Sequence, residues 1–512
     1  MTTAALSFLS RRPALWLAVL AAALGFGAFL MDGNVGLNLA DEGFLWYGMH
    51  ALKEGQIPIR DFYAYDPGRY FWVAGWSYLL GDGLVSLRAA CVIFQCLGVW
   101  CGLLAATRIS RDGKFLFAVA LTLSLWMTPR FKLFEQSIAL MGIYVAVRLI
   151  ELPTARQHFL SGLFVGFMAF MGRNHGAYLL VSFGLVACFL ARGEWRQLPG
   201  RALALGCGIA IGYLPQWIML ATVPGYFHAY VDRLQMDVAF GTNIPIPVPW
   251  PWRIPDGVGG LFWLDAFAQG CFYLGIPLVV AAAFLLLLFG GREKVRQHPV
   301  LLATACIALA YSHYAFSRAD FPHLAHAAPP FLLALIAAGS LVRKVSPLAV
   351  AAGALAATVP ATVLHTGAAA EWMSDRPLLP VEVRGQEMHV PLYSAAILQA
   401  ADRIAHQLSQ PEDQVLFMPH WPGLYAALGR RSPFKQIYFT GAASPRDEDE
   451  QLAILCEKRV KWAMLQDYKL DGRDELRVMN TNPRTMAYLR EHFRRYEMPG
   501  LPADTVVLKR VE

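Results

Sequence analysis

The sequence predicts a mainly α-helical, multi-pass membrane protein with about eleven spanning helices and a C-terminal α/β domain outside the membrane. Of its 512 residues, 56% are hydrophobic and only 16% are charged, whereas about 25% of the residues in ordinary soluble domains are charged. The mean hydropathy is +0.40. Long apolar segments recur as far as Leu364, and the composition then becomes polar. Together these observations favour a bilayer-embedded chain followed by a small water-exposed domain.

A membrane-spanning helix needs about 20 mostly apolar residues, or fewer where protein shields it. Eleven segments meet this criterion. They are Ala14–Met31, Leu87–Thr107, Phe115–Thr128, Leu133–Ile150, Phe159–Met171, Gly176–Ala191, Ala202–Val223, Leu261–Phe289, Val300–Phe316, Leu324–Val342 and Pro347–Leu364.

The distribution of basic residues predicts the orientation of these helices. Small basic groups precede the first helix and then occupy every second gap: Arg11/Arg12, Arg108/Arg111/Lys114, Arg148/Arg156, Arg192/Arg196/Arg201, Arg292/Lys294/Arg296 and Arg343/Lys344. Because cytoplasmic loops are enriched in Lys and Arg, these gaps and the N-terminus are expected in the cytoplasm. The loop of residues 32–86 and everything beyond the last helix then lie outside, which for a bacterial inner membrane is the periplasm.

The charge and cysteine patterns exclude two classes of protein. The net charge of +7 is spread over small groups between apolar segments and forms no long basic run, so nucleic acid is not expected as a partner. The eight cysteines include no C-x-x-C pair. Neither a cysteine metal site nor a disulfide framework is therefore expected.

Residues 371–512 alternate between short apolar runs and helical patterns. Strands are predicted at Gln414–Met418, Trp462–Leu465 and Thr505–Leu508, and helices at Tyr393–Gln407, Glu448–Lys458 and Asn482–His492. About 140 residues suffice for a separate core. We therefore predict two domains, a transmembrane domain over residues 1–366, which includes the outward loop 32–86, and an extracytoplasmic α/β domain over residues 371–512.

The outward loop opens with two adjacent acids, Asp41 and Glu42, at the start of a short aromatic-rich helix. Helical spacing places Asp41 on one stripe with Leu45 and Gly48, on an apolar inward face. Both acids would favour the helix dipole, which for Glu42 is an adequate explanation. A carboxylate on a packed face costs free energy unless it is paired or used. Asp41 is therefore a candidate general base or metal ligand.

A second group of polar residues lies in the outward turn within "YSHYAFSRADFPHLAHAAPP", where Arg318, Asp320, His323 and His326 fall within nine positions. The planar charge of Arg318 suits a phosphate. The alternative is an ordinary turn in which Asp320 caps the following helix and His323 is exposed. The segment "GRNHG" similarly places Arg173 and His175 between two apolar segments, as cavity-lining residues or as anchors at the membrane surface.

The loop "MPHWPGLYAALGRRSPF" follows a predicted strand of the C-terminal domain. It contains His420, Trp421, Arg430 and Arg431, which would suit a glycan acceptor through stacking and hydrogen bonds. The simpler interpretation is a strand-to-helix connection with ordinary surface charge.

The order of these elements resembles the GT-C superfamily of polyprenyl-phosphate-dependent membrane glycosyltransferases, including bacterial protein O-mannosyltransferases and aminoarabinose transferases. The resemblance covers residues 14–364 and is most specific over residues 39–70, "ADEGF" continued by "EGQIPIRDFYAYDPGRYFW". Related bacterial transferases are expected to carry "KPP" where this chain has "DPG". The resemblance implies an inverting transfer of sugar from a polyprenyl phosphate donor to a glycan, lipid or protein acceptor of the cell envelope.

The resemblance also implies roles for matching residues. Asp41 would be the base that deprotonates the acceptor hydroxyl, and Glu42 its partner, or both would bind a divalent metal (Mg or Mn) in members that use one. The donor phosphate would be held by outward cations, with supporting polar residues nearby. The cations are Arg318, Arg173, Arg69, Arg130 and Lys132, and the supporting residues are Asp320, His323, His175 and Asp66.

Two other classes of function compete with the transferase. A transporter or flippase of a lipid-linked glycan precursor would use Arg173, Arg318 and Asp320 along a path, but such proteins commonly have repeat-related halves, and the sequence contains no evident repeat. A non-catalytic envelope assembly protein would use the C-terminal domain to dock a partner. Donor turnover separates the transferase from both.

Overall fold

The computed structural model describes residues 13–192, 194–240, 244–366, 377–457 and 459–511. The chain separates into two compact units, which are described one at a time. The helical unit comprises Met1–Gly33 and Arg88–Met373, and the mixed unit comprises Asn34–Leu87 and Ser374–Glu512. The outward loop thus packs with the C-terminal residues, whereas the sequence places it in the membrane domain. The predicted junction between residues 366 and 371, and Arg11 and Arg12, lie outside the described residues.

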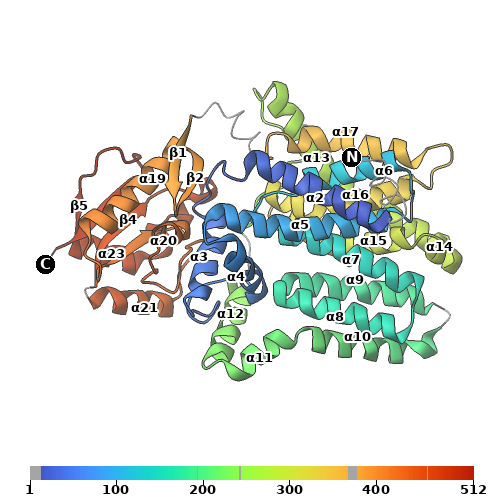
Figure 1. Ribbon diagram of the computed structural model, residues 1–512, viewed down its shortest axis with the longest axis horizontal. Coiled ribbons are helices and arrows are strands. Elements are labelled where there is room, and N and C mark those ends of the chain that lie inside the picture. Colours follow the sequence, from blue (N-terminus) through green and yellow to red (C-terminus); the bar gives the residue numbers. More distant parts are fainter. Residues whose placement is uncertain (1–12, 193, 241–243, 367–376, 458, 512) are drawn as a thin grey trace. The chain divides into compact units, whose positions relative to one another are not determined.

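The helical unit is built from apolar helices (Figure 1). Their bounds are α2 Pro13–Asp32, α5 Leu84–Ala106, α6 Gly113–Leu125, α7 Leu133–Glu151, α8 Ala155–Met171, α9 Arg173–Ala191, α10 Leu198–Gly212, α11 Leu214–Thr222, α12 Tyr226–Phe240, α13 Gly260–Phe289, α14 Gly291–Gln297, α15 Pro299–Ser317, α16 Phe321–Gly339 and α17 Pro347–Thr362; α5 begins in the mixed unit. Every segment predicted to span the membrane is helical. Residues 244–250, a Pro-rich run, form neither helix nor strand.

Seven of the described helices are long and apolar enough to cross a membrane, and the bent pair α10–α11 would make an eighth. Two further predicted spans, α6 and α17, are shorter apolar helices, and the eleventh, in the 17-residue α8, does not meet the criterion for a span. The apolar stretch of α16 is 83% buried and that of α7 is 78% buried, whereas only 17% of α2 is buried. α7 and α16 therefore form the centre of the unit, and α2 exposes its apolar side chains at the periphery, as a lipid-facing helix does.

Glycines allow the closest helix packing in this unit, between α8 and α10. A Cβ atom on Gly162 or Gly166 of α8 would meet the backbone of α10, and one on Gly208 or Gly212 would meet α8. Each pair has the small-xxx-small spacing that lets spanning helices approach backbone to backbone.

The mixed unit contains two helices of the outward loop and the C-terminal α/β fold (Figure 1). The elements are α3 Asp41–Lys53, α4 Pro67–Leu80, β1 Leu378–Val383, β2 Gln386–Pro391, α19 Leu392–Arg403, β3 Gln414–Met418, α20 Pro422–Leu428, α21 Pro445–Cys456, β4 Val460–Gln466, α22 Val478–Thr481, α23 Pro483–His492, β5 Phe493–Tyr496 and β6 Thr505–Arg510. All predicted strands and helices of this region are confirmed. The β1–β2 hairpin, β5 and α4 were not predicted.

The main sheet of the mixed unit has the order β3-β4-β6-β5. β3 and β4 are parallel, with Met418 opposite Leu465, and β6 runs antiparallel to both of its neighbours. Its core includes Leu416 and Met418 of β3 and Ala463 of β4, with Leu455 and Leu489 from the covering helices. Because β3 and β4 are parallel, the residues that follow them emerge at the same edge of the sheet.

α3 packs against α20 through two glycines. A Cβ atom on Gly43 would collide with the backbone of Gly423, and the Gly423 amide donates to the carbonyl oxygen of Leu39 at 3.0 Å. This backbone contact fixes the start of α3 against the segment that follows β3. It brings Asp41 to the carboxyl edge of the parallel strand pair.

Candidate functional site

Two side chains form hydrogen bonds at the start of α3. Asn38 Oδ1 accepts from the backbone amides of Ala40 and Asp41, both at 3.0 Å. Asp41 Oδ1 accepts a hydrogen bond from the hydroxyl of Tyr438 at 3.0 Å. The two residues are 397 positions apart. The acid at the start of the loop is therefore joined to the C-terminal part of the chain.

The two adjacent acids have different surroundings. Glu42 is 2% exposed, and its Oε2 accepts weakly from the amide of Asn38 at 3.4 Å, whereas Asp41 is half-buried. Both acids lie in the first turn of α3, where a negative charge complements the helix dipole. Every residue from Glu42 to Met49 is buried.

His420 and Tyr468 lie beside Asp41 at the carboxyl edge of β3 and β4. His420 Nε2 lies 2.7 Å from the carbonyl oxygen of Phe439, and Nδ1 lies 2.6 Å from the Tyr468 hydroxyl. A carbonyl only accepts, so Nε2 carries the proton and Tyr468 donates to Nδ1. Burial lowers the pKa of His420 to about 4, with the negative charges of Asp41 and Asp471 opposing the shift. The imidazole is neutral at pH 7.

Aromatic rings enclose this cluster on the side of the loop helices. The Tyr438 ring lies 4.8 Å from the ring of His420 and 5.6 Å from that of Phe44. Phe44 in turn lies 4.8 Å from Tyr65, and the guanidinium of Arg69 lies 5.1 Å from the centre of the Tyr65 ring. We define the Asp41 cluster as Asp41, Phe44, Tyr65, Arg69, His420, Tyr438 and Tyr468.

Half-buried side chains give the Asp41 cluster access to solvent. Asp41, Tyr65, Tyr438 and Tyr468 are all partly exposed, whereas Arg69 is 6% exposed. Arg69 is the one predicted phosphate ligand that belongs to the same unit as Asp41. Asp66, predicted as a supporting residue, precedes α4 in extended conformation at its N-cap position.

Arg173, a predicted phosphate ligand of the helical unit, forms a three-residue group with α12. Arg173 Nη2 lies 3.1 Å from Asp237 Oδ2, and Arg233 Nη2 lies 3.0 Å from Asp237 Oδ1. The guanidinium of Arg173 also lies 5.5 Å from the centre of the Tyr230 ring. Sequence reasoning missed Arg233, because the helical pattern of Tyr226–Phe240 was assigned to an outward gap.

The predicted group around Arg318 is assembled as a charged network. Arg318 Nε lies 2.6 Å from Asp320 Oδ2, and its Nη1 donates to the carbonyl of Ile244 at 2.9 Å. Asp320 caps α16 by accepting from the amide of His323 at 3.0 Å. Burial raises the pKa of Asp320, but the hydrogen bonds from His323 and Arg318 outweigh it and hold that pKa below its usual range. The His323 side chain is 12% exposed, so its interpretation as an exposed residue is wrong.

The remaining predicted residues of the helical unit lie in two other places. Arg130 pairs with Asp32 at 3.7 Å, and the Lys132 Nζ lies 5.7 Å from the centre of the Phe131 ring. His175 is fully buried, and its Nδ1 lies 3.1 Å from the Tyr311 hydroxyl. Three of the predicted cations of this unit therefore pair with different acids: Arg173 with Asp237, Arg318 with Asp320 and Arg130 with Asp32.

The loop after β3 does not offer the stacking surface considered for a glycan acceptor. His420 and Trp421 are only 3% and 4% exposed. Arg430 donates to backbone carbonyls, and Arg431 pairs with Glu54 at 2.6 Å. The loop contributes His420 to the Asp41 cluster instead.

A metal does not fit the acid pair. Among the described residues, no group of three or more His, Cys, Asp and Glu side chains is arranged to hold a metal ion. Asp41 and Glu42 alone supply two carboxylates, and Tyr438 already donates to one of them. No catalytic step is therefore assigned to a metal.

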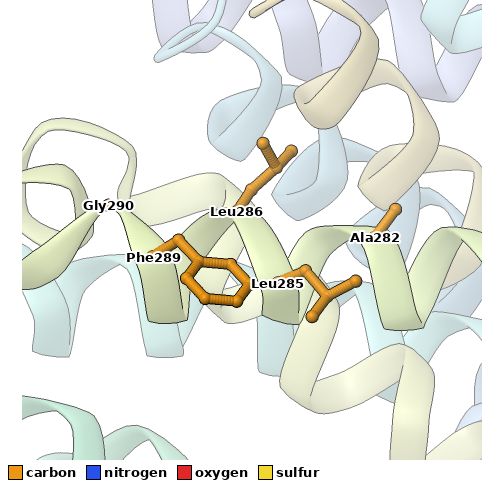
Figure 2. A pocket seen from close by; sticks show the side chains of 5 residues that line it. All are labelled: Ala282, Leu285, Leu286, Phe289 and Gly290. Atoms are coloured by element: carbon orange, nitrogen blue, oxygen red, sulfur yellow. The ribbon is translucent and has the colours of Figure 1, made fainter.

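An apolar pocket lies elsewhere, at the C-terminal end of α13 (Figure 2). Its volume is about 440 Å³, and it is lined by Ala282, Leu285, Leu286, Phe289 and Gly290. No ionisable side chain lines this pocket. Its walls suit hydrocarbon and supply no group for catalysis.

Acidification is expected to destabilise the mixed unit. Burial lowers the pKa values of His420 and His50 to about 4, below the ordinary value of 6.5. The unfolded state then binds these protons more tightly, so stability falls as the pH drops from about 6.5 and stops falling below about 4. Each histidine contributes roughly 3 kcal/mol to this loss. Unfolding midpoints at pH 7 and pH 5 measure it, and His420→Gln should reduce the difference by about half. If the unfolding midpoints of wild type and His420→Gln fell equally between pH 7 and pH 5, the assignment of this loss to His420 would be contradicted.

Comparison with known proteins finds solved structures of similar fold. No protein-family model and no curated protein sequence matches the chain. Among solved structures, the archaeal oligosaccharyltransferase AglB from Archaeoglobus fulgidus, in complex with an inhibitory peptide and a dolichol-phosphate, is 14% identical over 98% of this chain and 76% of its own, with a TM-score of 0.50.

ArnT from Cupriavidus metallidurans is also similar. Its apo structure is 14% identical over 99% of both chains, with a TM-score of 0.48. Its structure bound to undecaprenyl phosphate is 14% identical over 97% of this chain and 98% of its own, also with a TM-score of 0.48.

The chain is thus a multi-pass membrane protein with a C-terminal sheet-containing domain. Its fold is similar to that of the archaeal oligosaccharyltransferase, and at 14% identity this likeness concerns the fold alone.

Proposed function

We propose that this protein is an inverting glycosyltransferase that moves a sugar from a polyprenyl phosphate donor to a hydroxyl-bearing acceptor of the cell envelope. The observation that carries the proposal is the position of Asp41. Its carboxylate accepts a hydrogen bond from Tyr438 and lies in a partly open cluster. A similar fold occurs in a protein whose structure is in complex with a dolichol-phosphate and an inhibitory peptide, which supports a lipid-linked donor.

In the proposed reaction the acceptor oxygen attacks the anomeric carbon of the sugar. Asp41 takes the hydroxyl proton as the new carbon–oxygen bond forms, and the bond from the anomeric carbon to the phosphate oxygen breaks. The electron pair of that bond leaves with the polyprenyl phosphate. An alcohol is a weak nucleophile at neutral pH, and a positioned general base contributes typically about 10²–10⁴-fold to such a step.

The leaving phosphate gains negative charge, so the reaction needs fixed cations. We propose Arg173 as the first ligand, together with Arg233, because Asp237 brings the two guanidinium groups together. Guanidinium forks match phosphate oxygens in pairs. Arg318, Arg69, Arg130 and Lys132 remain candidates, and Asp320, His323, His175 and Asp66 are proposed as supporting residues.

We further propose that the mixed unit faces the periplasm of a bacterial inner membrane, with the N-terminus in the cytoplasm. The basic groups at alternate gaps support this orientation. Cys456 gives a direct test, because it is exposed and is the one cysteine of the mixed unit's sequence. A membrane-impermeant maleimide should modify Cys456 in intact cells with a permeable outer membrane, and Cys456→Ser should lose that label. Labelling of Cys456 only after lysis would reverse the orientation.

Donor turnover tests the proposed activity against transport. Purified protein in detergent is given a radiolabelled polyprenyl-phosphate sugar and a mixture of envelope acceptors. A transferase releases polyprenyl phosphate and transfers label to an acceptor without any membrane gradient. A flippase leaves the donor intact in detergent and moves it only between leaflets of a vesicle, which would overturn the proposal.

A further inference from the structure

We infer that Tyr438, supplied by the C-terminal domain, is a positioning residue that holds the carboxylate of Asp41 in its reactive orientation. The inference rests on the proposed function, since it assigns Asp41 the role of base. It gives the C-terminal domain a role in catalysis, because this domain then completes the site built on the outward loop.

The contact between the two residues has a defined direction. The Tyr438 hydroxyl lies 3.0 Å from Asp41 Oδ1, and an ionised carboxylate can only accept. Burial and the adjacent charge of Asp41 hold the pKa of Tyr438 well above its ordinary value. The phenol therefore keeps its proton and remains a donor throughout the working pH range.

The backbone around Tyr438 is fixed at both of its neighbours. Ile437 and Phe439 are each 1% exposed. The Phe439 amide donates to the carbonyl of Pro419 at 3.2 Å, and its carbonyl accepts from His420 Nε2 at 2.7 Å. The segment carrying Tyr438 is thereby tied to the loop that follows β3.

The Tyr438 ring is then held between two other rings. The centre of the Tyr438 ring lies 4.8 Å from the centre of the His420 ring and 5.6 Å from the centre of the Phe44 ring. His420 cannot rotate freely, because Tyr468 at the end of β4 binds its second nitrogen. The phenol is thus preorganised by the parallel strand pair, and Phe44 comes from the same helix as Asp41.

Preorganisation matters because a base acts only when its lone pair points at the proton it removes. An aspartate has free rotation about two bonds, and a fixed donor on one oxygen selects its orientation. Misplacement by about 1 Å can cost on the order of 10²-fold in rate.

Tyr438→Phe tests the inference, because it removes the hydroxyl and keeps the ring. We expect kcat to fall about 10- to 100-fold while the KM for donor changes less than about twofold. Other titratable or charged groups around the contact are unchanged in this variant: Glu42, Tyr65, Arg69, His420, Tyr468 and Asp471.

Tyr496→Phe is the matched control. Tyr496 lies on β5, the strand farthest from β3 in the sheet, and its ring packs on Trp462. Loss of its hydroxyl should leave kcat and the KM for donor unchanged. Both variants are compared with wild type by thermal unfolding in detergent.

Three outcomes decide the matter. A lower kcat with an unchanged KM for donor and an unchanged unfolding midpoint supports the inference. Wild-type kcat in Tyr438→Phe would overturn it, as would a loss of kcat matched by a lowered unfolding midpoint. Those results leave the proposed function standing as long as Asp41→Asn is inactive, whereas an active Asp41→Asn removes the proposed function itself.

Discussion

Replacing Asp41 by Asn is expected to reduce kcat for sugar transfer by about 10²–10⁴-fold, the contribution typical of a positioned general base. The amide has nearly the same shape as the carboxylate and still offers an oxygen to Tyr438, so the cluster should stay in place. It cannot take the proton of the acceptor hydroxyl at neutral pH. The KM for donor should change little, because the lost interaction belongs to the transition state. Transfer is measured with the radiolabelled polyprenyl-phosphate sugar.

Asp402→Asn serves as the control for this change. Asp402 is an exposed acid of α19 in the same unit, where it pairs with His406 at 2.8 Å. An exposed pair contributes little to stability, so both activity and unfolding midpoint should match those of wild type. Near-normal transfer by Asp41→Asn, with Asp402→Asn also normal, would reject Asp41 as the base.

Replacing Gly43 by Ala should produce the largest structural effect. The new methyl group would occupy the space of the Gly423 backbone, and neither backbone can yield without separating α3 from α20. Overpacking of this kind costs about 1–3 kcal/mol or more. It should also carry Asp41 away from Tyr438, so that transfer is lost together with a lowered unfolding midpoint.

Gly75→Ala is the matched control on the neighbouring helix α4. No heavy atom lies within 4 Å of a Cβ atom placed there, and its backbone is helical. Alanine should therefore be neutral or add about 0.5–1 kcal/mol through its higher helix propensity. If Gly43→Ala behaved like Gly75→Ala in both thermal unfolding and transfer, the α3–α20 contact would not be the one that fixes the site.

The membrane segments were predictable because length and apolar composition are local properties of the sequence. Each predicted span is helical, and the boundaries of α7 and α13 differ from prediction by one residue at most. Composition could not predict which spans are central. The burial of α16 and the exposure of α2 depend on packing partners far away in the chain.

The C-terminal domain was predictable wherever its strands are apolar and buried. β3 and β4 have such cores, and both were found. β5 was missed because its central residues Arg494 and Arg495 are exposed, and the β1–β2 hairpin because its alternating pattern includes Pro380 and several polar residues. Exposed strand segments lack the continuous apolar signal on which the prediction relied.

Only the part of the candidate site that lies in the outward loop was predictable from the sequence. Asp41 stood out because an acid followed the first span on a helix rich in aromatic residues. Tyr438 and His420 could not be joined to it, because hydrogen bonds across about 400 positions leave no local pattern. One signal was available: His420 and Tyr468 follow two predicted strands, and ligands of open α/β sheets bind beyond the carboxyl ends of strands.

The most direct test is a cryo-EM structure of the protein with bound polyprenyl phosphate. The account predicts that the lipid phosphate is contacted by at least one guanidinium group, first that of Arg173 or Arg233. A lipid phosphate bound without any arginine contact would contradict it.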